Sequence, residues 1–139
     1  MQPKTYRYDR LIKSEDLNHH RTLFAGRCAE WFVEAGFIAV ASVLPAKNIV
    51  CLKIHGLAFT QPLTTGDIAC FTSKIIYAGT SSIKVYVVLK RDNDDVPVVE
   101  GFITFVHVDD DGKTKPHLIS LDLTDPADIK LSQKAANLR

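Results

Sequence analysis

The sequence predicts a single α+β domain in which a curved antiparallel sheet of five strands wraps one long central helix, and the domain is expected to pair with a copy of itself. One β segment and one long helical segment precede four consecutive β segments along the chain. The helical segment becomes apolar on almost every side, so a sheet has to curve around it. The last strand carries large apolar side chains on both faces, and one of these faces needs a further partner.

The first elements are a strand and a long helix, joined by a polar loop. Residues 4–13 are rich in aromatic and β-forming side chains and predict the strand, and residues 14–21 form the loop. Residues 22–44 contain no proline, Thr22 is a suitable N-cap, and Pro45 ends the helix. The apolar residues of this segment recur at helical spacing: Leu23, Phe24, Cys28, Trp31, Phe32, Ala35, Ile38 and Ala39.

The remaining elements are predicted strands over residues 48–57, 68–77, 82–90 and 98–109. In the first of these, alternation puts Val50, Leu52 and Ile54 on one face and Cys51, Lys53 and His55 on the other. In the last, Phe102, Val106 and Val108 share one face, while Ile103 and Phe105 share the other. The tail from Pro126 onward predicts a short amphipathic helix with a frayed end.

Length and composition indicate one domain without a nucleic-acid or membrane role. The chain has no repeat and no linker, so residues 1–139 are predicted to form one domain with a short tail from about residue 122. Seventeen basic and sixteen acidic residues leave a net charge of +1, which is too small to attract nucleic acid or an anionic membrane. No apolar run is long enough to cross a bilayer, and residues 1–13 lack the continuous apolar stretch of a signal peptide.

Cysteine and histidine spacing predicts a cytoplasmic protein without a metal site. The three cysteines, Cys28, Cys51 and Cys70, show no CxxC spacing and are expected to stay reduced. The five histidines include one adjacent pair, His19-His20, but no HxxxH or HExxH motif.

Five motifs follow one another along most of the chain. Residues 18–26 look like an N-x-x-G-T-[LI]-F-G-G stretch, residues 30–36 like the start of a central helix, and residues 59–67 like an F-x-x-P-x-x-x-G-D turn. Residues 79–83 look like a G-[RT]-S-S loop, and residues 102–109 like a closing T-F-V-x-V-D strand. In this order, the set resembles the hotdog acyl-CoA thioesterases of the acyl-CoA hydrolase family.

The resemblance implies a hotdog fold and an enzyme that hydrolyses an acyl-CoA thioester to free acid and CoA, with CoA as part of the substrate and no separate cofactor. In that family the polar loop before the helix meets a helix carboxylate across the boundary between two subunits. A backbone N–H group at Gly26, or at its neighbour Ala25, is expected to polarise the thioester carbonyl. Asn18 would hold the carbonyl or the attacking water, and His20 would serve as a donor or a base.

The catalytic carboxylate of the family aligns with Val33, which can neither accept a proton nor attack a carbonyl. The next residue, Glu34, is therefore the candidate general base or nucleophile, although a shift of one position rotates a helical side chain by about 100°. The alternative for Glu34 is a solvated ion-pair stripe with Glu30 and Arg27.

Two further groups of residues are candidates for binding the substrate. Thr80, Ser81 and Ser82 occupy a loop that the family pattern places along the thioester or pantetheine channel. Arg21, which replaces a glycine of the pattern, would contact a phosphate or a carboxylate; its alternative is a surface cation.

Two other activities stay open on the sequence. A hotdog protein with Val33 in place of the carboxylate could bind acyl thioesters without hydrolysing them. Asp16 and His20 also loosely resemble the Asp/His pair of hotdog dehydratases or hydratases. The acyl chain length, and the choice between dimer, tetramer and hexamer, depend on packing that the sequence does not determine.

Overall fold

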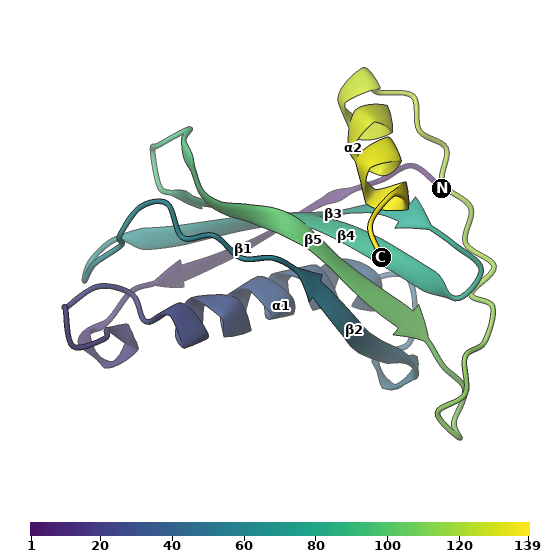
Figure 1. Ribbon diagram of the computed structural model, residues 1–139, viewed down its shortest axis with the longest axis horizontal. Helices are drawn as coiled ribbons and strands as arrows, with labels where there is room; N and C mark the ends of the chain where they lie inside the picture. Colours follow the sequence, from purple (N-terminus) through teal and green to yellow (C-terminus); the bar gives the residue numbers. More distant parts are fainter.

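The computed structural model describes all 139 residues and consists of one antiparallel sheet with a helix on each side (Figure 1). The elements are β1 (Thr5–Leu11), α1 (Ala25–Ala41), β2 (Ile49–His55), β3 (Ile68–Ala78), β4 (Ser82–Arg91), β5 (Pro97–His107) and α2 (Pro126–Ala136). The five strands are arranged in the order β1-β3-β4-β5-β2, with every neighbouring pair antiparallel. This confirms the predicted α+β class and the single long helix beside a five-stranded sheet. No helix is long and apolar enough to span a membrane.

The main core lies between α1 and one face of the sheet, which we call the α1 face. Buried side chains of the helix include Cys28, Trp31, Phe32, Ala35 and Ala39. They pack against β3, β4 and β5, where alternate residues such as Val85 and Ile103 are fully buried. The helix approaches the sheet closely at Gly36, because a Cβ atom there would lie 2.8 Å from the Ile103 side chain.

The helix begins later and ends earlier than predicted. Thr22 does not cap it, because the Thr22 N–H and hydroxyl both bond to the Asn18 side chain in the preceding loop. The residue before the first helical position is Phe24, and the helix ends at Ala41, ahead of Pro45.

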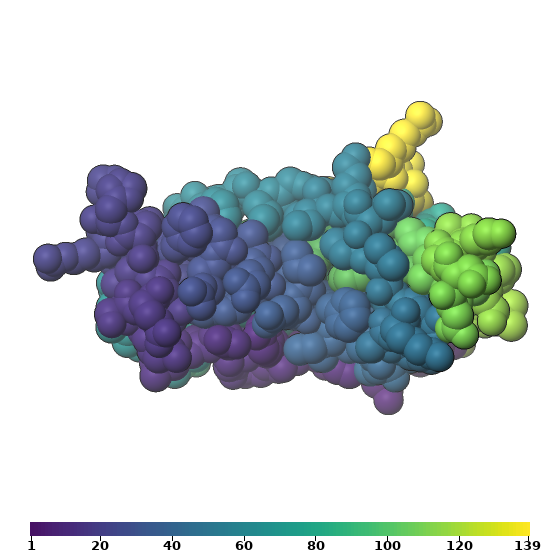
Figure 2. Space-filling view, turned by 90° about the horizontal axis from the view of Figure 1, so that it is seen from below, coloured from purple at the N-terminus to yellow at the C-terminus, as the bar shows by residue number.

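The outer face of α1 is not wrapped by the chain. In Figure 2 the helix lies on the surface between the N-terminal strand, in purple, and the segment that contains β2, in teal. Ile38 is 38% exposed on this face, and Glu30 and Glu34 are exposed as well. The apolar residues of the helical segment predicted a helix enclosed on nearly all sides. Within one protomer, however, the outer face of α1 is exposed.

A β-bulge corrects the predicted faces of β2. The register of β2 on β5 shifts between Cys51 and Lys53, so Leu52 has no partner in the pairing. After the bulge the alternation inverts: Ile54 packs with the core on the α1 face, whereas Lys53 lies opposite Thr104 on the other face. Strict alternation over residues 50–55 predicted that Ile54 shares a face with Leu52. This prediction is wrong because the bulge adds one residue to β2 relative to its pairing partners on β5.

The second face of the sheet is covered in part by the chain's own C-terminal helix, so we call it the α2 face (Figure 1). The predicted short helix is present as α2, and its Ala135 packs against Ile76 and Phe102 in a second apolar cluster. An ion pair of 2.8 Å between Lys74 and Asp128 fastens the start of α2 to β3. The need for a partner on this face is thus met within the chain at one end of the sheet.

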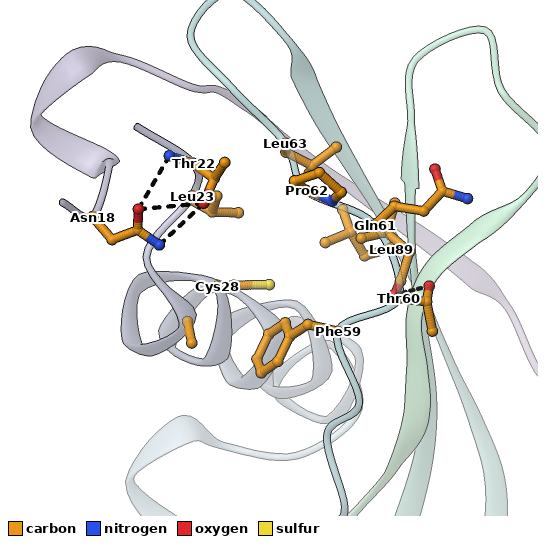
Figure 3. A pocket seen from close by; sticks show the side chains of 12 residues that line it. Asn18, Thr22, Leu23, Cys28, Phe59, Thr60, Gln61, Pro62, Leu63 and Leu89 are labelled. Atoms are coloured by element: carbon orange, nitrogen blue, oxygen red, sulfur yellow. Dashed lines mark hydrogen bonds between the residues drawn. The ribbon is translucent and has the colours of Figure 1, made fainter. Parts of the chain in front are cut away.

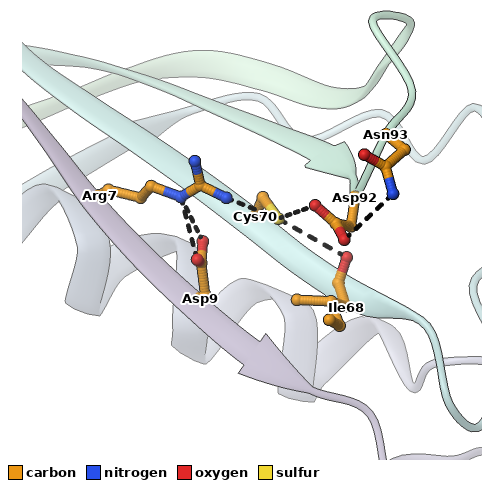
Figure 4. A network of polar contacts seen from close by, with 6 residues as sticks. All are labelled: Arg7, Asp9, Ile68, Cys70, Asp92 and Asn93. Carbon is orange, nitrogen blue, oxygen red and sulfur yellow. Dashed lines mark hydrogen bonds and ion pairs between the residues drawn. The ribbon is translucent and has the colours of Figure 1, made fainter.

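The other end of the α2 face is polar. Figure 4 shows Arg7 bonded to Asp9 and reaching the Cys70 thiol, with Asp92 on the other side of the sulfur. Cys70 therefore lies in a solvent-facing network, away from α1 and its core.

Lys84 ties the end of α2 to the sheet. Its ammonium donates hydrogen bonds to the carbonyl oxygens of Ala135 at 2.8 Å and Leu138 at 2.9 Å. It also lies over the Tyr77 ring at 4.8 Å from the centroid. Burial lowers the pKa of this ammonium below its usual range. The lysine thus adds a second donor to the Ala135 carbonyl oxygen, which also accepts from the Leu138 N–H at 3.1 Å, and supplies a donor to the Leu138 carbonyl oxygen.

Lys84→Met is expected to lower the free energy of unfolding by about 1–3 kcal/mol, because it removes both hydrogen bonds from β4 to the end of α2 and leaves the Leu138 carbonyl oxygen without its donor, while the length of the side chain is kept. Thermal unfolding by circular dichroism measures the change. Lys130→Met, at an exposed position of α2, is the matched control and should melt like the parent. Equal melting of both variants would show that α2 is not held by Lys84.

Candidate active site

The loop before α1 is a small hairpin organised by Asn18. Leu17 and Leu23 form an isolated bridge, and the Asn18 N–H donates to the Thr22 carbonyl oxygen at 2.8 Å. The Asn18 side-chain oxygen accepts from the N–H groups of His20 at 2.9 Å and Thr22 at 3.2 Å. Its nitrogen donates to the Thr22 hydroxyl at 3.1 Å, which leaves a second N–H of the amide free. The loop is therefore fixed before any ligand arrives.

Arg21 occupies the turn of this hairpin in a left-handed conformation, with φ of 62°. Glycine adopts this conformation without the steric cost that other residues incur, which explains the glycine of the family pattern at this position. The Arg21 side chain is exposed and forms no ion pair within the chain.

Arg21→Gly is expected to raise the free energy of unfolding by about 1 kcal/mol, because it removes a left-handed conformation that costs a non-glycine residue about 1–2 kcal/mol. Urea unfolding measures the gain. Arg21→Ala removes the same cation but keeps the strained backbone, so it should show no gain. A gain of the same size in Arg21→Ala would mean that the charge, and not the backbone, is responsible.

Asp16 fastens the loop to the first turn of α1. Its carboxylate is 2% exposed, accepts from the Lys13 N–H at 2.9 Å and pairs with Arg27 at 3.3 Å. Its carbonyl oxygen accepts from the Phe24 N–H at 2.9 Å. Arg27 thus pairs with Asp16 and not with the glutamates of α1, and Asp16 is bonded to the loop and to α1 rather than to a histidine.

The N-terminus of α1 is left without a cap. Phe24 offers no side-chain acceptor, and the N–H groups of Ala25, Gly26 and Arg27 have no hydrogen-bond partner in the chain. Such free amides carry the positive end of the helix dipole and suit a carbonyl oxygen that gains negative charge. The Phe24 ring lies against Gly26, where a Cβ atom would come within 2.6 Å of it. A side chain at position 26 would therefore require the exposed Phe24 ring to shift.

A cavity of about 360 Å³ opens beside these amides, between the start of α1 and the loop 59–63 (Figure 3). Its polar side chains are Asn18, Thr22, Thr60 and Gln61. Its apolar lining includes Leu23, Cys28, Phe59, Leu63, Leu89 and Val98. No carboxylate and no histidine lines it. The cavity can hold an apolar chain with a polar group at the helix N-terminus.

Hydrogen bonds hold both walls of the cavity. The Thr60 hydroxyl donates to the Val98 carbonyl oxygen at 2.8 Å, which fixes the loop to β5. The Leu23 N–H donates to the Leu63 carbonyl oxygen at 2.8 Å, which joins the two loops. Sequence reasoning treated residues 59–67 only as a turn motif, although the Phe-x-x-Pro spacing was the signal that could have marked this wall.

Of the predicted catalytic residues, Asn18 lines the cavity, Gly26 follows the lining residue Ala25, and Glu34 is not part of the lining. The Glu34 carboxylate is exposed and accepts a hydrogen bond from the Tyr8 hydroxyl of β1. Arg10 in turn donates to the Tyr8 oxygen at 2.9 Å. Val33 lies about 100° around α1 from Glu34, is half-buried and packs against the core. The role of Glu34 in catalysis stays a prediction.

His20 and the predicted binding loop lie apart from the cavity within one protomer. His20 is exposed and its ring contacts that of His19, with centroids 4.0 Å apart and the rings tilted by 44°. Ser82 begins β4, and the cavity residue Leu89 lies seven residues further along the same strand, a span of about 23 Å. At that far end, His117 donates its N–H to the Thr80 carbonyl oxygen at 3.1 Å, and the His107 N–H donates to that of Ser81 at 2.7 Å.

The structure contains no group of three or more histidine, cysteine, aspartate or glutamate side chains that could hold a metal ion. Near the cavity, the groups that could bond to a ligand are the backbone amides at the start of α1 and the Asn18 side chain.

Comparisons with known proteins agree with this architecture. A family model described as the Thioesterase superfamily matches residues 20–98. The chain is 28% identical over 105 residues to an uncharacterized acyl-CoA thioester hydrolase, YkhA, of Bacillus subtilis; the match covers 73% of this chain and 60% of that protein.

Two solved structures extend the comparison. An acyl-CoA hydrolase from Staphylococcus aureus, in complex with butyryl coenzyme A and coenzyme A, superimposes with a TM-score of 0.82 at 27% identity, over 95% of this chain and 79% of that one. A hexameric hotdog fold thioesterase of Campylobacter jejuni gives a TM-score of 0.70 at 27% identity, over 78% and 86%. With more than half of its length matched by the family model, the chain belongs to the thioesterase superfamily and has the hotdog fold.

Proposed function

We propose that this protein hydrolyses acyl-CoA thioesters to a free acid and CoA. The observation that carries the proposal is the uncapped N-terminus of α1, whose free amides lie beside an apolar cavity and the Asn18 side chain. The acyl-CoA hydrolase from Staphylococcus aureus and the relative from Bacillus subtilis support the same substrate class.

In the proposed reaction, the thioester carbonyl oxygen lies at the amides of Ala25 and Gly26, and the free N–H of Asn18 holds the carbonyl or the water. The water oxygen adds to the acyl carbon, and the amides stabilise the negative charge that develops on the carbonyl oxygen. The carbon–sulfur bond then breaks, the acid leaves with the water oxygen, and a proton from the water ends on the CoA sulfur. Because no carboxylate lines the cavity, any carboxylate base has to reach it from outside this lining.

We propose further that the complete site forms between two copies of the chain joined through β2. This strand lies at the edge of the sheet, and its Val50 and Leu52 are 48% and 66% exposed. In a two-fold pair, antiparallel β2 strands would place the Ile49 end of one protomer beside the His55 end of its partner. The His55 end leads into the cavity wall, and the Ile49 end adjoins the turn with Thr80, Ser81 and Ser82. Pairing would bring the predicted binding loop to the partner's cavity.

Activity and mass test the proposal together. We expect the purified protein to release free acid and CoA from acyl-CoA, and to have a mass in light scattering that is a multiple of the 15.5-kDa chain. Leu52→Lys on the β2 edge should reduce both assembly and activity. Leu11→Lys is the matched control, because Leu11 is 57% exposed and lies on β1, at the opposite edge of the sheet. Binding of acyl-CoA without turnover, or formation of an enoyl-CoA, would instead support the non-hydrolytic or the hydratase alternative.

A further inference from the structure

Buried residues close the inner end of the cavity. Leu63, Leu89 and Val98 are between 0% and 2% exposed, whereas Phe59 at the mouth is 47% exposed. Cys28, in the first turn of α1, is 2% exposed, and Figure 3 shows its sulfur directed into the space between the helix and the loop 59–63. The cavity thus has an open polar mouth, marked by Asn18 and the helix amides, and a closed apolar end.

We propose that this cavity is the acyl pocket, that it takes short acyl chains, and that Cys28 sets its depth. The inference rests on the proposed function and adds the class of acyl group to it. A chain whose thioester lies at the Ala25 amide would pass Cys28, because Cys28 follows Ala25 by three residues and so lies on the same side of the helix, near one turn further in.

The volume supports a short chain. About 360 Å³ is at the low end of the range of roughly 300–1,000 Å³ that small-molecule sites occupy, and part of it has to hold the thioester itself. The end wall cannot recede easily, because Leu89 is a fully buried residue of β4 and the loop that carries Leu63 is bonded to the hairpin before α1.

Cys28 contributes to this wall as an uncharged group. Burial raises the pKa of its thiol to about 12, so the sulfur stays protonated near neutral pH and behaves as a small apolar surface. A side chain larger than cysteine at this position would fill the inner cavity, and a smaller one would deepen it.

A panel of acetyl-, butyryl-, hexanoyl-, octanoyl- and palmitoyl-CoA tests the inference, with the loss of ultraviolet thioester absorbance as the readout. The parent should favour the short chains over palmitoyl-CoA by at least about tenfold in kcat/KM. Cys28→Leu should lower kcat/KM for hexanoyl-CoA by about tenfold or more relative to acetyl-CoA, since one methylene in an apolar pocket changes discrimination by about 10–200-fold. Cys28→Ala should shift the preference toward longer chains.

Cys70→Leu on the α2 face is the matched control and should keep the profile of the parent. Circular dichroism verifies folding, and the smaller Cys28→Ala variant keeps the test valid if Cys28→Leu does not fold. If the parent hydrolyses no member of the panel, the proposed function itself fails. If the parent hydrolyses the panel but prefers palmitoyl-CoA, or if both Cys28 variants keep its profile, the function stands and the inference is overturned.

Discussion

Asn18→Ala is expected to lower kcat for acyl-CoA hydrolysis by about 100-fold, because loss of one preorganised donor to a developing oxyanion costs about 10²–10³ in rate. The side-chain nitrogen of Asn18 has one N–H bonded to Thr22 and a second free at the cavity. The substitution also removes the acceptor of the loop hydrogen bonds from His20 and Thr22, so a loss of activity alone would not separate catalysis from loop order.

Asn18→Asp makes that separation. Aspartate keeps an oxygen that can accept from both loop N–H groups but lacks the N–H donor. We expect this variant to melt within a few degrees of the parent and still to lose about 100-fold in kcat. Steady-state kinetics and thermal unfolding measure the two effects. Full activity in Asn18→Asp would show that Asn18 serves only to order the loop.

Val33→Asp is expected to raise kcat by about tenfold or more, since a positioned general base contributes about 10²–10⁴ and the cavity has none. Position 33 lies about 100° around α1 from Glu34 and its Tyr8 contact, and it is the position where the family pattern has its carboxylate. A carboxylate at this half-buried site should also lower the free energy of unfolding, by about 1 kcal/mol.

Glu34→Gln tests the other candidate position for the general base. We expect kcat to change by less than about threefold, because general-base catalysis needs the group within hydrogen-bond reach of its target and Glu34 faces β1. Glutamine is a matched replacement, because its side-chain oxygen can still accept from the Tyr8 hydroxyl. A loss of about 100-fold would establish Glu34 as the base after all, and no gain in Val33→Asp would remove position 33 from the mechanism.

The order and type of the elements could be predicted from the sequence because periodicity carries that information. The strand predicted over residues 82–90 is present as β4, and its alternate residues Ile83, Val85, Val87 and Leu89 are buried in the core. The C-terminal helix was also expected, but its docking was not, because the bonds from Lys84 to the end of α2 join residues about fifty positions apart.

The local geometry of the site could not be read from periodicity. The loop bonds of Asn18 take Thr22 away from the helix, so a suitable N-cap residue does not cap. The bulge at Leu52 inverts the faces of β2 through one extra residue, which leaves no mark in an alternating pattern. The walls of the cavity come from residues 18–28 and 59–63 and from β4 and β5, so they become neighbours only once the sheet has formed.

The bare start of α1 also has a consequence for directed evolution. Serine, threonine or aspartate in place of Phe24 would supply the missing acceptor, and such a change typically adds about 1 kcal/mol of stability. Selection of random variants for heat resistance alone would therefore favour a residue at position 24 whose side chain accepts a hydrogen bond from a free N–H group in the first turn of α1. The same variants would fill the position meant for the substrate oxygen, so thermal tolerance and turnover should diverge at this one residue.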